Sequence, residues 1–285
     1  MSVSDDRIAR PGSVTPVRLT AVEFGDGRKR TGDSLATEEP MEIRLDAPGM
    51  EQRQVAVTMR TPGNDFELAA GFLLTEGLVA ATGDVRSVRY CSVPREEQQY
   101  NVVTVDLARP YDADLLQRNF YTTSSCGICG KASLDSISVR CAPVADGPEV
   151  PEAVVVELPG RLREAQLLFD RTGGLHAAGL FDAGGRLLEL REDVGRHNAV
   201  DKLVGQALLA GTLPLSERVL MVSGRLSFEI VQKAAVAGIP VVCAVSAPSS
   251  LAVDAGRRFG MTLVGFLRGS RFNIYTGPER IPTVE

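Results

Sequence analysis

Two cysteines separated by two residues are the most reactive pair in this sequence. Cys126 and Cys129 lie in the run Ser-Ser-Cys-Gly-Ile-Cys-Gly-Lys, with a glycine after each thiol and Lys131 close behind. A thiolate is the nucleophile of sulfur chemistry, and a nearby cation or a helix N-terminus lowers the pKa of a thiol. Residues 131–137 can begin such a helix, whose positive end would face the pair. Redox catalysis, zinc binding and sulfur transfer all use C-x-x-C pairs, so the motif alone leaves these three uses open.

The remaining metal-binding side chains are few and scattered. A closed structural zinc site usually needs four Cys or His ligands. Beyond the pair, the candidates form no second C-x-x-C and no H-x3-H pattern; they are Cys91, Cys141, Cys243, His176 and His197. We therefore predict no structural metal. Cys243 lies within an apolar run and is predicted to be a core residue, whereas Cys91 and Cys141 receive no role.

Composition and charge exclude several classes of protein. The chain has 285 residues, of which 44% are hydrophobic and 24% charged, as in a soluble globular protein. A net charge of −5 without a basic tail argues against nucleic acid as a partner. The polar start lacks the apolar stretch of a secretory signal, and the apolar run 66–81 is too short to span a bilayer. Five scattered cysteines fit a reducing compartment. We expect a cytoplasmic protein without membrane insertion.

The chain divides into two parts with different patterns. Residues 1–14 are polar and are predicted to be a disordered tail, and residues 15–122 are predicted to form a small α+β domain. The expected elements are strands over 17–21, 41–45, 55–59, 85–90 and 101–107 and a helix over 65–75.

Residues 123–285 show a more regular alternation of strands and helices. A hairpin is expected around 182–186, and short linkers between the later strands and helices imply right-handed crossovers and a parallel core. The expected strands span 175–181, 187–191, 218–222, 241–245 and 261–267, and the expected helices span 199–210, 228–237 and 251–259. The sequence thus predicts an α/β fold for this half.

Four linkers should leave strands at one edge of this sheet, where open α/β sheets bind their ligands. They span 192–198, 223–227, 246–250 and 268–271. We call these four segments the rim. Its polar residues are Arg196, His197, Asn198, Ser223, Arg225, Ser227, Ser246, Ser249, Ser250, Arg268 and Arg271. Three of the linkers precede helix N-termini, which favour anions, and arginine binds phosphate in a bidentate manner. The rim would suit a large ligand with several phosphates; alternatively, its serines and asparagine are helix caps.

Other polar residues are weaker candidates. His176 follows a double glycine and, taken alone, is predicted to be a core histidine, whereas His197 in its polar linker is the better ligand-site candidate. Glu192 and Asp193 are adjacent at a strand end and should point apart, so Asp193 is expected to cap a helix or to pair with Arg196. The sequence contains no G-x-S-x-G motif and no P-loop, so no motif in it indicates a hydrolase or a kinase.

The chain resembles the formate dehydrogenase accessory sulfurtransferase family (FdhD/NarQ) from about residue 38 to residue 276. The segments that carry the resemblance occur in the same order along the chain, at 39–44, 58–63, 71–77, 125–130, 172–178, 191–202, 246–250 and 265–272. So many ordered matches are far more specific than the cysteine pair alone.

The resemblance implies a function in sulfur transfer. The family takes persulfide sulfur from a cysteine desulfurase and passes it to the molybdenum cofactor, bound as bis-molybdopterin guanine dinucleotide, before that cofactor enters the formate dehydrogenase catalytic subunit. Cys126 would hold the persulfide and Cys129 would assist. The family's cofactor-binding stretch is matched here by Phe266, Leu267, Arg268, Gly269, Ser270 and Arg271. GDP would then be a partial ligand, and the family implies a homodimer.

The same resemblance implies a fold: α/β, or α+β overall, with a mixed-sheet, three-layer α/β/α C-terminal domain like that of cytidine deaminases and a smaller N-terminal α+β domain. Ala177 and Ala178 follow His176, so the glutamate of the deaminase H-x-E motif is absent and the likeness would be one of fold only. Two other functions stay open. A thiol–disulfide oxidoreductase would cycle the two cysteines, and a nucleotide-binding regulatory module would need the rim but not the thiols.

Overall fold

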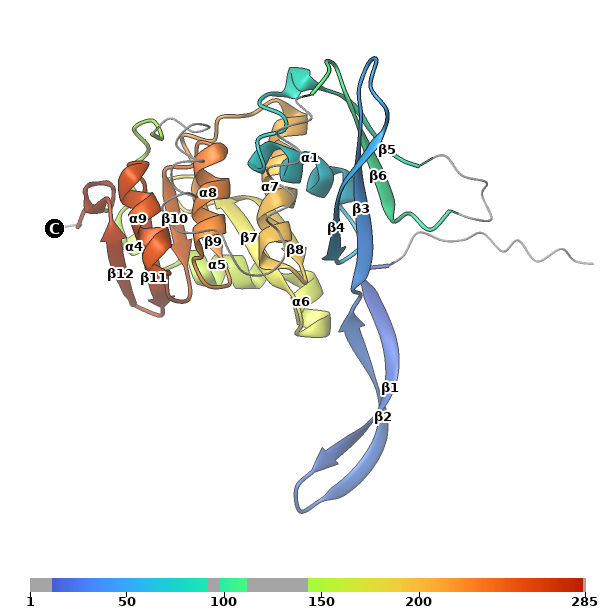
Figure 1. Ribbon diagram of the computed structural model, residues 1–285. Coiled ribbons are helices and arrows are strands. Elements are labelled where there is room, and N and C mark those ends of the chain that lie inside the picture. Colours follow the sequence, from blue (N-terminus) through green and yellow to red (C-terminus); the bar gives the residue numbers. More distant parts are fainter. Residues whose placement is uncertain (1–11, 92–97, 112–142, 284–285) are drawn as a thin grey trace, which may run out of the picture.

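A computed structural model describes residues 12–91, 98–111 and 143–283. In these residues the chain has a mixed α/β fold with three sheets: a two-stranded ribbon, a four-stranded sheet and a six-stranded sheet (Figure 1). The predicted domain boundary between residues 122 and 123 lies outside the described residues and stays a prediction. Of the tail predicted over residues 1–14, residues 1–11 also lie outside the described residues, whereas Val14 already begins a strand.

The four-stranded sheet has the strand order β4-β3-β6-β5. Its strands are β3 (Glu39–Asp46), β4 (Arg53–Arg60), β5 (Val85–Tyr90) and β6 (Val102–Leu107). Only the β3–β6 pair is parallel. Along β3 every second residue is buried, namely Met41, Ile43 and Leu45, and these side chains share one hydrophobic core with helix α1 (Asp65–Thr75). The predicted strands and helix of this half are confirmed, with small shifts at their ends.

The six-stranded sheet has the order β12-β11-β10-β9-β7-β8. Its strands are β7 (His176–Phe181), β8 (Leu187–Asp193), β9 (Val219–Val222), β10 (Val241–Ala244), β11 (Thr262–Arg268) and β12 (Arg271–Thr276). Strands β9, β10 and β11 are parallel, as predicted, and β7 and β12 are antiparallel to their neighbours. Because β8 is antiparallel to β7, it points the same way as β9. Every residue of β9 and β10 is buried, which fits central strands covered on both faces.

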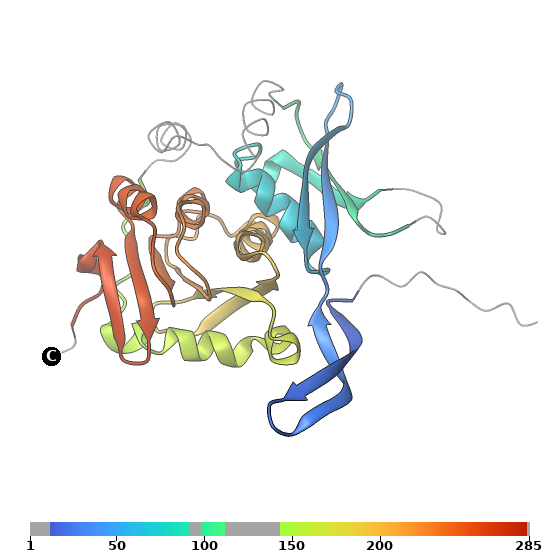
Figure 2. The ribbon, with the colours of Figure 1, turned by 60° about the horizontal axis from the view of Figure 1, so that its bottom comes forward.

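Helices cover both faces of this sheet, so that half of the molecule has three layers (Figure 2). One face is covered by α7 (Arg196–Ala210), α8 (Phe228–Val236) and α9 (Ser250–Arg258). The other is covered by α4 (Glu152–Val155) and α5 (Leu158–Ala165), and α6 (Leu167–Thr172), which follows them, packs against the two-stranded ribbon. Two 3-10 turns, η1 (Thr82–Asp84) and η3 (Pro278–Arg280), complete the described elements. The sequence did not predict α4, α5 and α6, because each is short and α5 contains Pro159 and Gly160.

The two larger sheets meet through helices α1 and α7, which cross at two glycines. A Cβ on Gly71 would lie 1.9 Å from the carbonyl oxygen of Asp201, and a Cβ on Gly205 would lie 1.8 Å from that of Glu67. Any side chain at either position would therefore force the helices apart. The close crossing merges the apolar residues around α1 with those beneath α7, α8 and α9 into one core.

The two-stranded ribbon consists of β1 (Val14–Glu23) and β2 (Gly27–Ala36), paired antiparallel along their whole length. The prediction of a strand over 17–21 is confirmed, and the structure extends it. The sequence did not predict β2, because this segment is rich in Gly, Arg, Lys and Asp and lacks apolar alternation. It also did not predict β12, which pairs with β11 in a hairpin after the tight turn at Gly269.

Candidate functional site

The predicted sulfur site lies outside the described residues. Cys126, Cys129, Cys141 and the helix expected over residues 131–137 all belong to the segment 112–142, so their geometry stays a prediction. Of the other cysteines, Cys243 is fully buried in β10, as predicted, and burial raises the pKa of its thiol to about 12. A thiol held neutral in this way is inert, so Cys243 is excluded as a nucleophile.

The four rim segments form one continuous edge, as the sequence predicted. Strands β8, β9, β10 and β11 all end there. His197 Nε2 lies 3.2 Å from Ser227 Oγ, which joins the start of α7 to the segment after β9. The amide of Leu226 donates to the carbonyl of Ala247, which joins the segments after β9 and β10. The amide of Phe266 donates to the carbonyl of Ser246, which adds the β11–β12 hairpin.

In the part of the chain that the structure describes, no arginine of the rim forms an ion pair with a carboxylate, although Glu229 lies close enough to Arg196 for the two charges to interact. Arg196 is the first residue of α7, and its Nε is buried without a hydrogen-bond partner among these residues. Arg225 and Arg271 are exposed and have no partner among the described residues, and Arg268 donates within the same residues to the carbonyl of Val245. A buried guanidinium N–H that lacks an acceptor carries a desolvation cost, which an anionic ligand would remove.

Two histidines adjoin Arg196. His176 begins β7, whose start lies at the edge where β9 ends, because these strands are antiparallel. A Cβ placed on Gly224 would lie 3.5 Å from His176 Nδ1 and 3.8 Å from Arg196 Cδ, so these three residues meet. Burial, with the nearby Arg196 guanidinium, lowers the pKa of both histidines, that of His197 to about 4. Both rings are therefore neutral at pH 7. The charges of this corner are those of Arg196 and of Glu229, whose carboxylate lies 3.8 Å from His197 Nε2.

The β11–β12 hairpin places one aromatic ring on the rim. Phe266 has a left-handed backbone with φ +51° and an exposed fraction of 42%. A bulky residue in this region of backbone space is strained, and such strain gathers at functional sites. The side chain of Leu267 is buried in the core, so it can reach a ligand only through its backbone. Gly269 and Ser270 form the exposed turn that follows.

The rim serines mostly have structural partners. Ser249 Oγ accepts the amide of Ala252 and so caps α9, which is the alternative that the sequence left open. Ser223 Oγ accepts the amide of Ala177 and ties the segment after β9 to the start of β7. Ser246 contributes its carbonyl to Phe266, and Ser250 is the exposed first residue of α9. These residues shape the rim, and the side chains there that have no carboxylate partner among the described residues are its arginines.

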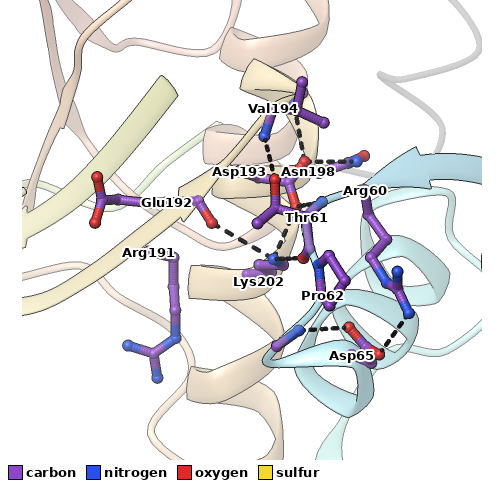
Figure 3. Close-up of polar contacts among 12 residues, drawn as sticks. Arg60, Thr61, Pro62, Asp65, Arg191, Glu192, Asp193, Val194, Asn198 and Lys202 are labelled. Carbon is purple, nitrogen blue, oxygen red and sulfur yellow. Dashed lines mark hydrogen bonds and ion pairs between the residues drawn. The ribbon is translucent and has the colours of Figure 1, made fainter. Parts of the chain in front are cut away.

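A buried polar cluster anchors the rim to the four-stranded sheet (Figure 3). Asp193 ends β8, and its carboxylate accepts bonds from the amides of Thr61 and Gly195 and from Asn198 Nδ2. Lys202 Nζ lies 2.7 Å from Asp193 Oδ2 and donates to the carbonyl of Thr61. Asp193 thus binds Gly195 and Asn198 at the start of α7, but the predicted cap is wrong, because the N-cap residue is Gly195 and no described side chain caps this helix. The ionic partner of Asp193 is Lys202 and not Arg196. We call Thr61, Asp193, Asn198 and Lys202 the latch.

The contacts of the latch contradict the prediction that the side chain of Asn198 is available to bind a ligand at the rim. Its amide donates to the carbonyl of Met59 as well as to Asp193, its carbonyl oxygen accepts from Thr58, and the side chain is buried. The structure therefore places Asn198 at the junction of the two sheets, away from solvent. Glu192 points the other way, as predicted, and accepts the amides of Leu168 and Phe169 at the start of α6.

A second buried charge supports the same junction. Arg60, fully buried, pairs with Glu39 and Asp65 and donates to the carbonyl of Tyr100. Asp65 also accepts the amide of Gly63, so the connection between β4 and α1 is held on both sides (Figure 3). Sequence reasoning missed both clusters. The available signal was three charged residues, Arg60, Asp193 and Lys202, within otherwise apolar strand and helix ends.

Within the described residues, no group of three or more His, Cys, Asp or Glu side chains is arranged to hold a metal ion. In the same part of the chain no helix combines the length and apolar character needed to cross a membrane.

A mixed sheet between two helix layers, with several arginines at the edge where its parallel strands end, defines this part of the chain as a three-layer α/β protein. The model of the FdhD/NarQ family matches residues 36–282, and the chain belongs to that family.

Individual relatives agree with this assignment. The chain is 54% identical to a sulfur carrier protein FdhD of Streptomyces coelicolor, over 95% of this chain and 96% of the relative. It is 53% identical to a protein of the same description from Mycobacterium tuberculosis, over 87% and 92%. Among solved structures, it resembles a protein from Desulfotalea psychrophila named for an accessory role to formate dehydrogenase. That likeness has a TM-score of 0.73 at 27% identity and covers 94% of this chain and 99% of the other.

Proposed function

We propose that this protein is a sulfurtransferase that takes persulfide sulfur from a cysteine desulfurase and delivers it to the bis-molybdopterin guanine dinucleotide molybdenum cofactor needed by formate dehydrogenase. Family membership and the names of the relatives support sulfur carriage. The structural observation that carries the proposal is the rim, where Arg196 holds a buried N–H without an acceptor among the described residues.

The rim has the chemistry that a guanine dinucleotide requires. Arg196, Arg225, Arg268 and Arg271 can contact phosphates, and charge-assisted bonds from arginine are among the stronger hydrogen bonds in proteins. The N-terminus of α7 adds free amides and a positive dipole end. The exposed ring of Phe266 offers a surface for a guanine base. In this proposal the cofactor is the substrate, and its phosphates and bases hold it on the rim.

The thiol chemistry follows from a persulfide exchange. The Cys126 thiolate attacks the terminal sulfur of the donor's persulfide, a new S–S bond forms at Cys126, and the donor's own S–S bond breaks to release its cysteine thiolate. This step transfers one sulfur atom with no net oxidation or reduction. Cys129 assists as a second thiol. In the second step the S–S bond at Cys126 breaks, Cys126 returns to a thiolate, and the outer sulfur becomes a sulfide ligand of the substrate's metal, which supplies the two electrons for that reduction. The contacts of the rim with the nucleotide arms would hold the substrate near Cys126.

Several finer features belong to the same proposal. The mixed sheet between two layers of helices supports the cytidine-deaminase-like fold that the family resemblance implies. A cytoplasmic location, a homodimer, and docking to a cysteine desulfurase and to the formate dehydrogenase catalytic subunit are likewise part of it. No structural metal is required.

Persulfide formation tests the sulfur step. The purified protein, mixed with a cysteine desulfurase and cysteine, should gain one sulfur atom on Cys126 in intact-mass and peptide analysis. Cys126→Ala should abolish the gain, whereas Cys91→Ala, which removes a half-buried thiol elsewhere, should leave it intact. Full loading of the Cys126 variant would refute the assignment. A disulfide that cycles between Cys126 and Cys129 without bound sulfur would favour the oxidoreductase alternative.

Nucleotide titration tests the rim separately. GDP should bind to the wild-type protein in calorimetry, more weakly than the whole cofactor because only one arm is present. Arg268→Ala or Arg271→Ala should lower the affinity roughly ten- to a hundredfold, since each removes a charge-assisted bond worth about 1.5–3 kcal/mol. Arg257→Ala, an exposed arginine on α9, is the matched control and should have no effect. GDP binding without any persulfide loading would favour the regulatory module.

A further inference from the structure

Cys91 is a thiol to which neither the sequence nor the proposed function gives a role. It follows β5, and its amide donates to the carbonyl of Val102, so it continues the pairing of β5 with β6. Tyr90 packs on the core, and alternation therefore places Cys91 on the other face of the four-stranded sheet, turned away from α1 (Figure 1). Because the residue is a free cysteine and only half-buried, small molecules in solution can reach this thiol.

Two arginines flank the thiol. Arg89 precedes Cys91 by two residues on the same face, and Arg44 of β3 lies on that face across β6. Hydrogen bonds to Glu42 and to Asp106 raise the pKa of Arg44 and of Arg89 respectively, and the charge of a Cys91 thiolate adds to both shifts. Both guanidinium groups are therefore close enough for their charges to act at the sulfur.

Both arginines keep donors that the neighbouring carboxylates do not use. Arg44 bonds to Glu42 through Nε, so its two Nη groups have no partner among the described residues. Arg89 bonds to Asp106 and Asp46 through Nε and Nη2, which leaves its Nη1 without a partner among the same residues. The two side chains are 34% and 41% exposed, so an incoming molecule can reach them. Guanidinium N–H groups bind carboxylates through charge-assisted hydrogen bonds.

A buried hydroxyl lies between the two arginines. Thr104 of β6 is directly opposite Arg44 on one side and Arg89 on the other. It is fully buried, and its Oγ1 has no hydrogen-bond partner in the part of the chain that the structure describes. A desolvated hydroxyl without a partner carries a cost, which a ligand that bonds to it removes. Cys91 pairs with Val102, two residues along β6 and on the same face, so thiol and hydroxyl are neighbours.

We propose that Cys91 is a modification site that forms a mixed disulfide with a small thiol bearing a carboxylate. The Cys91 thiolate attacks one sulfur of the symmetrical disulfide of that thiol, an S–S bond forms at Cys91, and the reagent's own S–S bond breaks. The released thiolate takes up the proton that Cys91 lost, and the disulfide is the oxidant, so no further reagent is needed. The carboxylate of the bound half lies between Arg44 and Arg89 and accepts a bond from the Thr104 hydroxyl.

Two disulfide probes of opposite charge test the site on the full-length protein. Oxidised glutathione carries carboxylates, whereas cystamine carries two ammonium groups and no carboxylate. Trypsin releases Cys91 in the peptide 90–95, which contains no other cysteine, so mass analysis of this peptide measures the adduct at Cys91 alone. In the wild type we expect glutathione on this peptide, and a faster reaction with oxidised glutathione than with cystamine.

Arg44→Gln should lower the ratio of the two rates, glutathione over cystamine, roughly three- to tenfold, because it removes one attractive charge. Arg44 is the better choice than Arg89, whose partner Asp106 is buried, so the variant should stay folded in circular dichroism. Arg86→Gln is the matched control, since it removes an exposed charge of the same strand about 16 Å along the chain from Cys91, and it should leave the ratio unchanged.

Thr104→Val tests the hydroxyl without changing any charge. The equilibrium constant for glutathione exchange at Cys91 should fall roughly two- to tenfold, because the carboxylate loses one hydrogen bond. The unmodified variant should be at least as stable as the wild type, since the unpartnered hydroxyl is gone. An unchanged exchange constant would remove Thr104 from the site.

Two outcomes would overturn the proposal: no glutathione on the peptide 90–95 under conditions that modify other cysteines of the chain, or an unchanged ratio of rates in Arg44→Gln. The site is independent of the sulfur chemistry, because it uses a different thiol on a different sheet. Failure of persulfide loading or of GDP binding would count against the proposed function and leave the Cys91 site intact.

Discussion

Lys202 Nζ lies 2.7 Å from Asp193 Oδ2, and both side chains are buried where the two larger sheets meet. Besides forming an ion pair with each other, the two side chains bind neighbouring elements of the fold. Asp193 orders the first turn of α7, and Lys202 reaches back to the carbonyl of Thr61 at the end of β4. The segment that presents Arg196 and His197 is therefore held in place by groups from both sheets (Figure 3). The geometry of the rim depends on this junction.

Lys202→Met should strongly destabilise the protein. It leaves the Asp193 carboxylate buried without its cation, and breaking a buried pair in this way costs about 3–5 kcal/mol in the free energy of unfolding. Urea unfolding followed by circular dichroism measures the loss. The double variant Asp193→Asn, Lys202→Met removes both charges and should recover part of it. A loss below about 1 kcal/mol in the single variant would show that the latch does not stabilise the fold.

Gly205→Ala should also be destabilising, for a steric reason. Its Cβ would lie 1.8 Å from the carbonyl oxygen of Glu67, so α1 and α7 must separate. Overpacking of this kind costs about 1–3 kcal/mol or more. Gly160→Ala in α5 is the control, since a Cβ there meets no atom within 4 Å, and it should stabilise by roughly 0.5–1 kcal/mol through helix propensity. Equal melting temperatures for the two variants would contradict the tight crossing.

Phe266→Gly should lower the affinity for GDP without lowering the stability of the fold. Glycine accepts the φ of +51° without strain, so the free energy of unfolding should rise by about 1 kcal/mol or stay level. If the ring stacks on a guanine, GDP affinity should fall roughly five- to a hundredfold in calorimetry. Phe24→Gly, at the exposed end of the ribbon, should leave GDP affinity unchanged. Unaltered GDP binding by Phe266→Gly would remove the ring from the proposed site.

His197 should make stability depend on pH below neutrality. Burial, with the Arg196 guanidinium, lowers its pKa from 6.5 to about 4 in the folded protein. Between these values the unfolded chain binds a proton that the folded protein rejects, so stability is full above pH 6.5 and falls as the pH drops toward 4. Urea midpoints between pH 7 and pH 5 should fall less in His197→Gln than in the wild type.

His176→Gln is a second test in that series, because His176 is the other of the two histidines in the sequence and its pKa is also lowered. Removing it should reduce the slope as well, and the double variant should show the flattest profile. Identical slopes in the wild type and in both single variants would mean that neither histidine is buried in its neutral form.

Local pattern was enough to determine much of this molecule. Alternation along residues 41–45 and the continuous apolar run at 241–245 predicted strands, because burial on one face or on both imposes those patterns. Turn residues and short links predicted the parallel core, and a parallel core in turn places the linkers that follow its strands at one edge. The cysteine pair at 126 and 129 and the arginines of the rim were visible in the same way.

The features that only the tertiary structure determined are contacts between residues far apart along the chain. Asp193 accepts the amide of Thr61 across 132 residues, and Arg191 pairs with Glu67 across 124, so no local spacing encodes either partner. The same holds for Asn198, which looked like a rim ligand among polar neighbours and proved to be buried against Met59. The sequence around Gly71 and Gly205 does not indicate a role for either glycine, because their role is to let two helices cross closely in the tertiary structure. Strand β2 lacks an apolar stripe because most of it is exposed, and hydrophobic periodicity reports only on residues that are buried.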